Sequence, residues 1–150
     1  MAPTPSPDRR PLGRFPAAVV FLHGQPGSAR DWDAVVHLLA LASPATVAVV
    51  PDRPGWGTSH MEAGGLYENA TRIVSALDDA DVEEAVVVGH SWGGGVALAL
   101  AASHPDRVAG LVLAGSLNPT QPPGVLDVVF GYAFAGPLLA FVYEAVLRGL

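Results

Sequence analysis

Four short runs of apolar residues, separated by segments with a helical hydrophobic period, constrain the fold more than any other feature of the sequence. The runs are rich in β-branched residues and cover 17–22, 46–50, 85–88 and 108–114. Continuous rather than alternating apolar strands are typical of a parallel sheet whose two faces are both covered by helices. We therefore expect each run to be a strand that is buried on both faces.

The segments between these runs predict three helices. Ser28 and Asp31 have the spacing of a capping box ahead of an apolar stripe that begins at Trp32. A second stripe at helical spacing covers 66–77, and the nearly all-apolar segment 92–103 predicts a buried helix. The order β-α-β-α-β-α-β predicts an α/β fold with a doubly wound, mostly parallel sheet and right-handed crossovers.

The last part of the chain differs in composition from the segments before it, and the sequence as a whole falls into three parts. The stretch 128–143 carries no charge, but its 16 residues are fewer than the roughly 20 that a membrane span needs, and Gly136-Pro137 interrupts it. We expect two short helices of a lid here, with a membrane segment over 125–147 as the alternative. The predicted parts are a loose lead-in over 1–16, a core over 17–118 and the start of a cap over 119–150.

Composition excludes several classes of function. The net charge of −6, without a cluster of Lys or Arg, argues against nucleic acid as a partner. The chain has no cysteine, which excludes disulfides and thiolate metal sites, and we expect no metal and no cofactor. Arg9 and Arg10 precede an apolar run that is too short for an export signal, so a cytoplasmic protein is expected.

The strongest chemical signal is Gly89-His90-Ser91-Trp92-Gly93, directly between a predicted strand and a predicted helix. A nucleophile on such a sharp turn needs small neighbours, because its own backbone is strained and the chain packs closely on both sides. The turn would also place Ser91 at the positive end of the helix, where developing negative charge is favoured. The alternative is a glycine-rich helix start in which Ser91 is only an N-cap.

A second signal follows the first predicted strand, in the segment His23-Gly24-Gln25-Pro26-Gly27. Acyl transfer needs two backbone N–H groups that converge on the oxyanion of the tetrahedral intermediate. Trp92, directly after the nucleophile, would supply one donor, and Gln25 is placed to supply the other. Pro26 has no N–H and cannot donate. The alternative is an ordinary turn.

The segment 51–59 contains two glycines but lacks the third glycine of a dinucleotide fingerprint, and it opens no clear helix. A nucleotide-binding function is therefore not predicted. Asp52 is instead expected to hold this loop together through Asx-type hydrogen bonds.

Taken in order, HGQPGSARDW, PDRPGWGTS, GHSWGG and HPDRVAGLVLAGS resemble the α/β-hydrolase superfamily over about 17–118. The resemblance implies that the four strands correspond to strands 3 to 6 of an eight-stranded sheet. It also implies that Ser91 is the nucleophile, that Gln25 and Trp92 are the oxyanion donors, and that a cap begins after Asn118. Haloalkane dehalogenases and epoxide hydrolases of this superfamily carry aspartate at the nucleophile. Serine points instead to esterases, lactonases, C–C hydrolases, aminopeptidases and perhydrolases.

A serine nucleophile also needs a histidine base and an orienting acid, and neither is evident. His104 is the only histidine after Ser91, and the intervening helix of about 12 residues would hold them roughly 18 Å apart. His23 and His90 are expected to pack within their motifs. His60 is the remaining candidate base, although no acid partner for it is apparent.

The family's alternative position for the acid, after the sixth strand, reads Ser116-Leu117-Asn118 and holds no carboxylate; Asp127 and Glu144 are expected to be solvated. We predict a hydrolase of a small hydrophobic ester, lactone or related acyl substrate, close to inactive as these 150 residues. The outer edge of the 108–114 strand would also be uncovered. The alternative function is a non-catalytic binding protein with the same fold.

Overall fold

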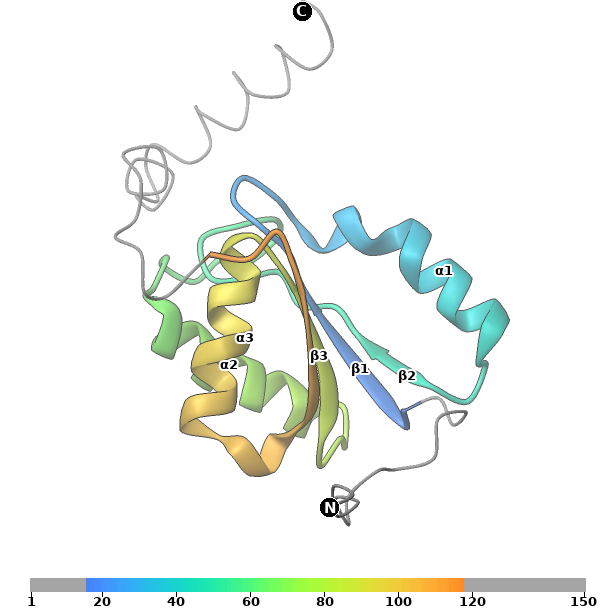
Figure 1. The fold of residues 1–150 in the computed structure, drawn as a ribbon. Helices are drawn as coiled ribbons and strands as arrows, with labels where there is room; N and C mark the ends of the chain where they lie inside the picture. Colours follow the sequence, from blue (N-terminus) through green and yellow to red (C-terminus); the bar gives the residue numbers. More distant parts are fainter. Residues whose placement is uncertain (1–15, 118–150) are drawn as a thin grey trace, which may run out of the picture.

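A computed structural model describes residues 16–117, which form a parallel sheet with helices on both faces (Figure 1). The four strands run in the order β2-β1-β3-β4, and each pair of neighbours is parallel. Their bounds are Ala18–Leu22 (β1), Val47–Val49 (β2), Ala85–His90 (β3) and Val108–Ala114 (β4). The predicted doubly wound α/β sheet is confirmed. The expected lead-in and cap, with Asp127, Glu144 and the alternative membrane segment, lie outside the described residues.

Each predicted helix is present between the strands that were expected to flank it. They are α1 (Asp33–Ala42), preceded by the 3-10 turn η1 (Ala29–Trp32), α2 (Leu66–Asp79) and α3 (Trp92–Ser103), which the turn η2 (Pro105–Arg107) follows. In Figure 1, α1 lies on one face of the sheet, while α2 and α3 lie on the other. At the start of η1 the Ser28 N–H donates to the Asp31 carboxylate at 3.1 Å, as the capping-box spacing predicts.

The hydrophobic core lies between the sheet and the pair α2 and α3. All five residues of β1 are buried, as a strand in the middle of the sheet should be. The predicted burial of the apolar helix α3 is confirmed, since seven of its 12 residues are buried. The innermost side chains of this layer are Val20, Leu22, Ile73, Leu77, Val87, Val96 and Leu100.

The expectation that every strand is buried on both faces is wrong for β2 and β4. These are the two edge strands, and Val112 in β4 is 50% exposed. No residue of α1 is buried, and Leu38 and Leu41 expose 64% and 69% of their surface. Within residues 16–117 no strand pairs with the outer edge of β4, so this edge is uncovered as anticipated.

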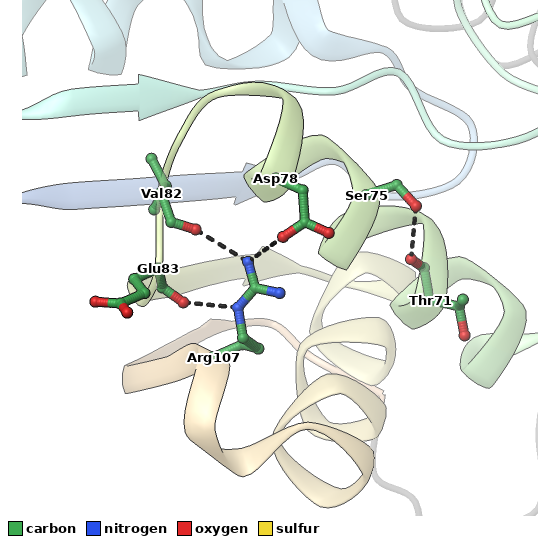
Figure 2. A network of polar contacts seen from close by, with 6 residues as sticks. All are labelled: Thr71, Ser75, Asp78, Val82, Glu83 and Arg107. Atoms are coloured by element: carbon green, nitrogen blue, oxygen red, sulfur yellow. Dashed lines mark hydrogen bonds and ion pairs between the residues drawn. The ribbon is translucent and has the colours of Figure 1, made fainter.

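At the end of the sheet away from the β-strand carboxyl termini, Arg107 joins three parts of the chain (Figure 2). Its Nε donates to the Glu83 carbonyl at 2.6 Å, and Nη2 donates to the Val82 carbonyl at 3.0 Å. Nη2 also lies 2.7 Å from a carboxylate oxygen of Asp78, which is largely exposed. Arg107 therefore ties η2 to the end of α2 and to the segment that enters β3.

We expect Arg107→Met to lower the free energy of unfolding by about 1.5 kcal/mol, because two backbone carbonyls lose a charged donor. Urea denaturation measures the change. Arg72→Met is the matched control, since Arg72 is an exposed arginine of α2. Equal stabilities of the two variants would show that the Arg107 contacts contribute nothing measurable.

Candidate active site

Ser91 is the single residue between the end of β3 and the start of α3, and its backbone is strained. Its φ of 51° and ψ of −117° lie in a region that residues other than glycine rarely occupy. An N-cap serine would have extended dihedral angles and would accept a hydrogen bond from the first turn of the helix. Ser91 has neither feature, so the N-cap alternative does not fit the structure.

Glycines on both sides of Ser91 allow the turn to pack directly against the sheet. A Cβ atom on Gly93 would collide with the carbonyl oxygens of Leu22 and His23, at the carboxyl end of β1. A Cβ atom on Gly89 would lie 2.5 Å from the carbonyl oxygen of Gly93. Only glycine fits at these two positions, and this explains the spacing that the sequence shows around Ser91.

The backbone of Ser91 is also tied to the end of β4. Its N–H donates to the Ala114 carbonyl at 3.0 Å, and its carbonyl accepts from the Leu117 N–H at 3.2 Å. Ser91 therefore lies at the carboxyl ends of β1, β3 and β4, the edge at which ligands bind in open α/β sheets.

The loop after β1 contacts this turn. A Cβ atom on Gly24 would lie 3.2 Å from the Ser91 Cβ and 3.0 Å from Nδ1 of His90. Gln25 is the next residue of this loop, and Trp92 is the first residue of α3, where backbone N–H groups have no partner within the helix. The segments that carry Ser91, Gln25 and Trp92, the three site residues predicted from the sequence, thus meet at the carboxyl end of β3.

His23 is completely buried beneath this loop, as its expected packing role requires. Its Nε2 accepts from the Arg53 backbone N–H at 3.0 Å, and its Nδ1 lies 2.9 Å from the Gly24 carbonyl. These partners assign a neutral ring with the proton on Nδ1. Burial, assisted by the nearby Arg53 charge, lowers the pKa of His23 to about 4.

Arg53 is the residue of this region that the sequence did not reveal. Only 1% of it is exposed, and its guanidinium contacts three consecutive residues of the loop after β1. Nε donates to the His23 carbonyl at 3.0 Å, Nη2 to the Gly24 carbonyl at 2.8 Å and Nη1 to Gln25 Oε1 at 3.3 Å. Burial lowers the pKa of Arg53 to about 9, so the group is still charged at neutral pH.

Asp52 joins the loop that follows β2 to the start of η1. Its carboxylate accepts from the Ala29 N–H at 2.7 Å and from the N–H and hydroxyl of Thr58, both at 2.8 Å. Burial opposes ionisation, but these hydrogen bonds outweigh it and lower the pKa of Asp52. The expected bonding within its own loop is present, and the bond to Ala29 adds a link to the start of η1.

The other histidines are not arranged as a base for Ser91. His104 follows the last residue of α3, at the opposite end of the helix, while His37, His60 and His90 are exposed. In the described part of the chain, Ser91 Oγ forms no hydrogen bond with a histidine, and the residues after β4, Ser116 and Leu117, carry no carboxylate. Residues 16–117 also hold no group of acidic or histidine side chains suited to a metal.

A family model described as the alpha/beta hydrolase family matches residues 19–149 of the sequence. The chain belongs to this family. Its relatives include the 2-hydroxymuconate semialdehyde hydrolase of Pseudomonas sp. (strain CF600), which is 35% identical over 118 residues, covering 76% of this chain and 42% of the relative. The lipase LipV of Mycobacterium tuberculosis is 39% identical over 99 residues, covering 65% of this chain and 36% of the relative.

Solved structures agree with this assignment. The esterase EaEST from Exiguobacterium antarcticum superposes with a TM-score of 0.62 at 26% identity, over 73% of this chain and 41% of the esterase. The chain thus spans less than half the length of the relatives that it matches. Between residues 16 and 117, no helix is long and apolar enough to cross a membrane.

Proposed function

We propose that the protein is a serine hydrolase that cleaves an ester, lactone or related acyl bond, with Ser91 as the nucleophile. The observation that carries this proposal is the strained backbone of Ser91 at the start of α3, packed against Gly24. A serine held in this conformation presents its hydroxyl at the edge of the sheet, where the helix N-terminus favours negative charge. A purely structural residue would have no reason to keep the strain.

In the proposed reaction, Ser91 Oγ attacks the carbonyl carbon of the substrate while a histidine base takes its proton. The carbonyl oxygen becomes an oxyanion, which accepts hydrogen bonds from the backbone N–H groups of Trp92 and Gln25. Collapse of this intermediate breaks the acyl bond, and the leaving group takes the proton from the histidine. Water then releases the acyl group from Ser91 by the same steps.

The proposed acid and histidine lie C-terminal to β4, in the chain order serine, acid, histidine that this fold uses. The 1–150 chain alone should therefore be close to inactive, because loss of the base lowers turnover by as much as about a million-fold. The names of the relatives, a lipase, an esterase and a semialdehyde hydrolase, support a carbonyl-containing substrate. We propose a small hydrophobic acyl compound, without a metal or other cofactor.

A fluorophosphonate probe tests the assignment of the nucleophile in the full-length protein. We expect one covalent adduct, which peptide mass spectrometry places on Ser91, because only an activated hydroxyl attacks phosphorus at a useful rate. Ser116→Ala is the matched control, because Ser116 lies near the same helix start. This variant should still form the adduct, since the Ser116 hydroxyl itself is not expected to react. Absence of the adduct from folded full-length protein would overturn the proposal.

A second candidate function is supported by the lack of any histidine or acid on Ser91 within residues 16–117. In that case the protein would use the same site to bind an acyl compound without turnover. Turnover of p-nitrophenyl esters that disappears in Ser91→Ala would exclude this candidate, while saturable binding without turnover would favour it.

A further inference from the structure

Within residues 16–117, Arg53 is a buried cation whose hydrogen bonds go to backbone and amide oxygens and not to a carboxylate. In the described residues its guanidinium donates to two carbonyls and one side-chain amide, and its central carbon lies over the Trp56 ring, 6.0 Å from the ring centroid. Burying an arginine without an acidic partner is expensive, and an apolar side chain would often stabilise the fold as well or better. The place of these hydrogen bonds, in the loop after β1, indicates a function for the buried charge.

All three acceptors belong to the loop after β1, which contacts Ser91. The Gly24 carbonyl accepts from Arg53 Nη2 at 2.8 Å and also from His23 Nδ1 at 2.9 Å, but only Arg53 brings a positive charge to it. This carbonyl shares one peptide group with the N–H of Gln25. In a trans peptide, such as Gly24–Gln25, the C=O and the N–H point in opposite directions. A carbonyl held towards Arg53 therefore turns the Gln25 N–H away from Arg53, and it fixes the rotation of the whole peptide plane.

The positive charge has a second effect on the same peptide. Amide resonance transfers electron density from nitrogen to oxygen, and a cation at the oxygen increases this transfer. The N–H consequently becomes a stronger donor, as in a chain of polarised hydrogen bonds in a medium of low dielectric constant. Arg53 would thus both orient and polarise the donor, without touching the substrate.

We propose that Arg53 is a positioning residue for the oxyanion hole, acting on the substrate only through the Gly24–Gln25 peptide. This inference rests on the proposed function, since it assumes that the Gln25 N–H binds the oxyanion. Such a residue is most important when charge develops on the carbonyl oxygen, so its loss lowers kcat and the affinity for an oxyanion analogue more than it changes KM.

The test compares Arg53→Met and Arg53→Lys in the full-length protein, with p-nitrophenyl butyrate as substrate and an alkyl trifluoromethyl ketone as oxyanion analogue. Arg107→Met is the matched control, because Arg107 also donates to two backbone carbonyls but at the other end of the sheet. We expect Arg53→Met to lose about 100-fold in kcat and in affinity for the ketone, similar to the loss of one oxyanion donor. KM should change less than about threefold, and lysine, which keeps the charge, should restore part of kcat.

Thermal denaturation separates this role from a structural one. If Arg53→Met folds and keeps kcat within about threefold of the wild type, the inference is wrong. If Arg53→Met does not fold, the Arg53→Lys variant is compared with an Arg107→Lys variant of equal stability. The inference requires a lower kcat in Arg53→Lys, and equal kcat values of the two variants overturn it. Failure of the proposed function is distinguishable, because wild-type protein would then show neither turnover nor a fluorophosphonate adduct.

Discussion

Ser91→Gly should lower turnover by about a million-fold and, at the same time, raise the free energy of unfolding by about 1 kcal/mol. The loss follows from removal of the proposed nucleophile, by comparison with the knockout of a catalytic serine in a protease. The gain follows from the positive φ of Ser91, because glycine adopts this conformation without a Cβ clash. Relief of about 1–3 kcal/mol of strain exceeds the roughly 0.5–1 kcal/mol that glycine adds to the unfolded-state entropy.

Two variants isolate the two effects. Ser91→Ala should lose turnover equally but gain no stability, since alanine keeps the Cβ atom. Among residues 16–117, Asp81 is the other non-glycine residue with positive φ. It follows α2 in a Schellman arrangement in which the Val82 N–H donates to the Leu77 carbonyl. Asp81→Gly should therefore stabilise slightly and leave turnover unchanged. If urea denaturation finds Ser91→Gly no more stable than Ser91→Ala, the strain argument for Ser91 fails.

The strand and helix pattern could be predicted from the sequence because each element is locally consistent. Residues 108–114 read as a continuous apolar run, and residues 92–103 form an apolar segment at the start of which glycines surround Ser91. Those local patterns set the order of elements, and parallel α/β connections leave few topologies for that order. The residues around Ser91 were predictable for the same reason, because a tight strand–turn–helix needs glycine at fixed offsets.

Burial was less predictable, since it depends on neighbours in space. β1 and β4 have similar apolar sequences, but β1 is central and fully buried whereas β4 is an edge strand with exposed leucine and valine side chains. Arg53 shows the converse: arginine is rarely buried, and nothing local in PDRPG indicates that the loop after β1 folds over its guanidinium. Such a residue becomes visible only when segments about 30 positions apart are brought together.

His23 should make the protein sensitive to mild acid. Its pKa is about 4 in the folded protein and about 6.5 when unfolded, so between these values the unfolded state binds more protons than the folded state. The stability that a neutral His23 provides is therefore complete above pH 6.5 and decreases as the pH falls towards 4. The difference of about 2.5 pKa units corresponds to about 3 kcal/mol.

The structural reason is that a protonated ring has no acceptor for the Arg53 backbone N–H, which donates to Nε2 in the neutral form. Protonation would also place a second cation beside the buried guanidinium. Urea denaturation between pH 7 and pH 4 measures the effect, and His23→Gln should remove about 3 kcal/mol of the pH dependence because glutamine accepts without titrating. A His23→Gln profile parallel to that of the wild type would show that the loop after β1 tolerates a charged His23, and the expected acid sensitivity would be wrong.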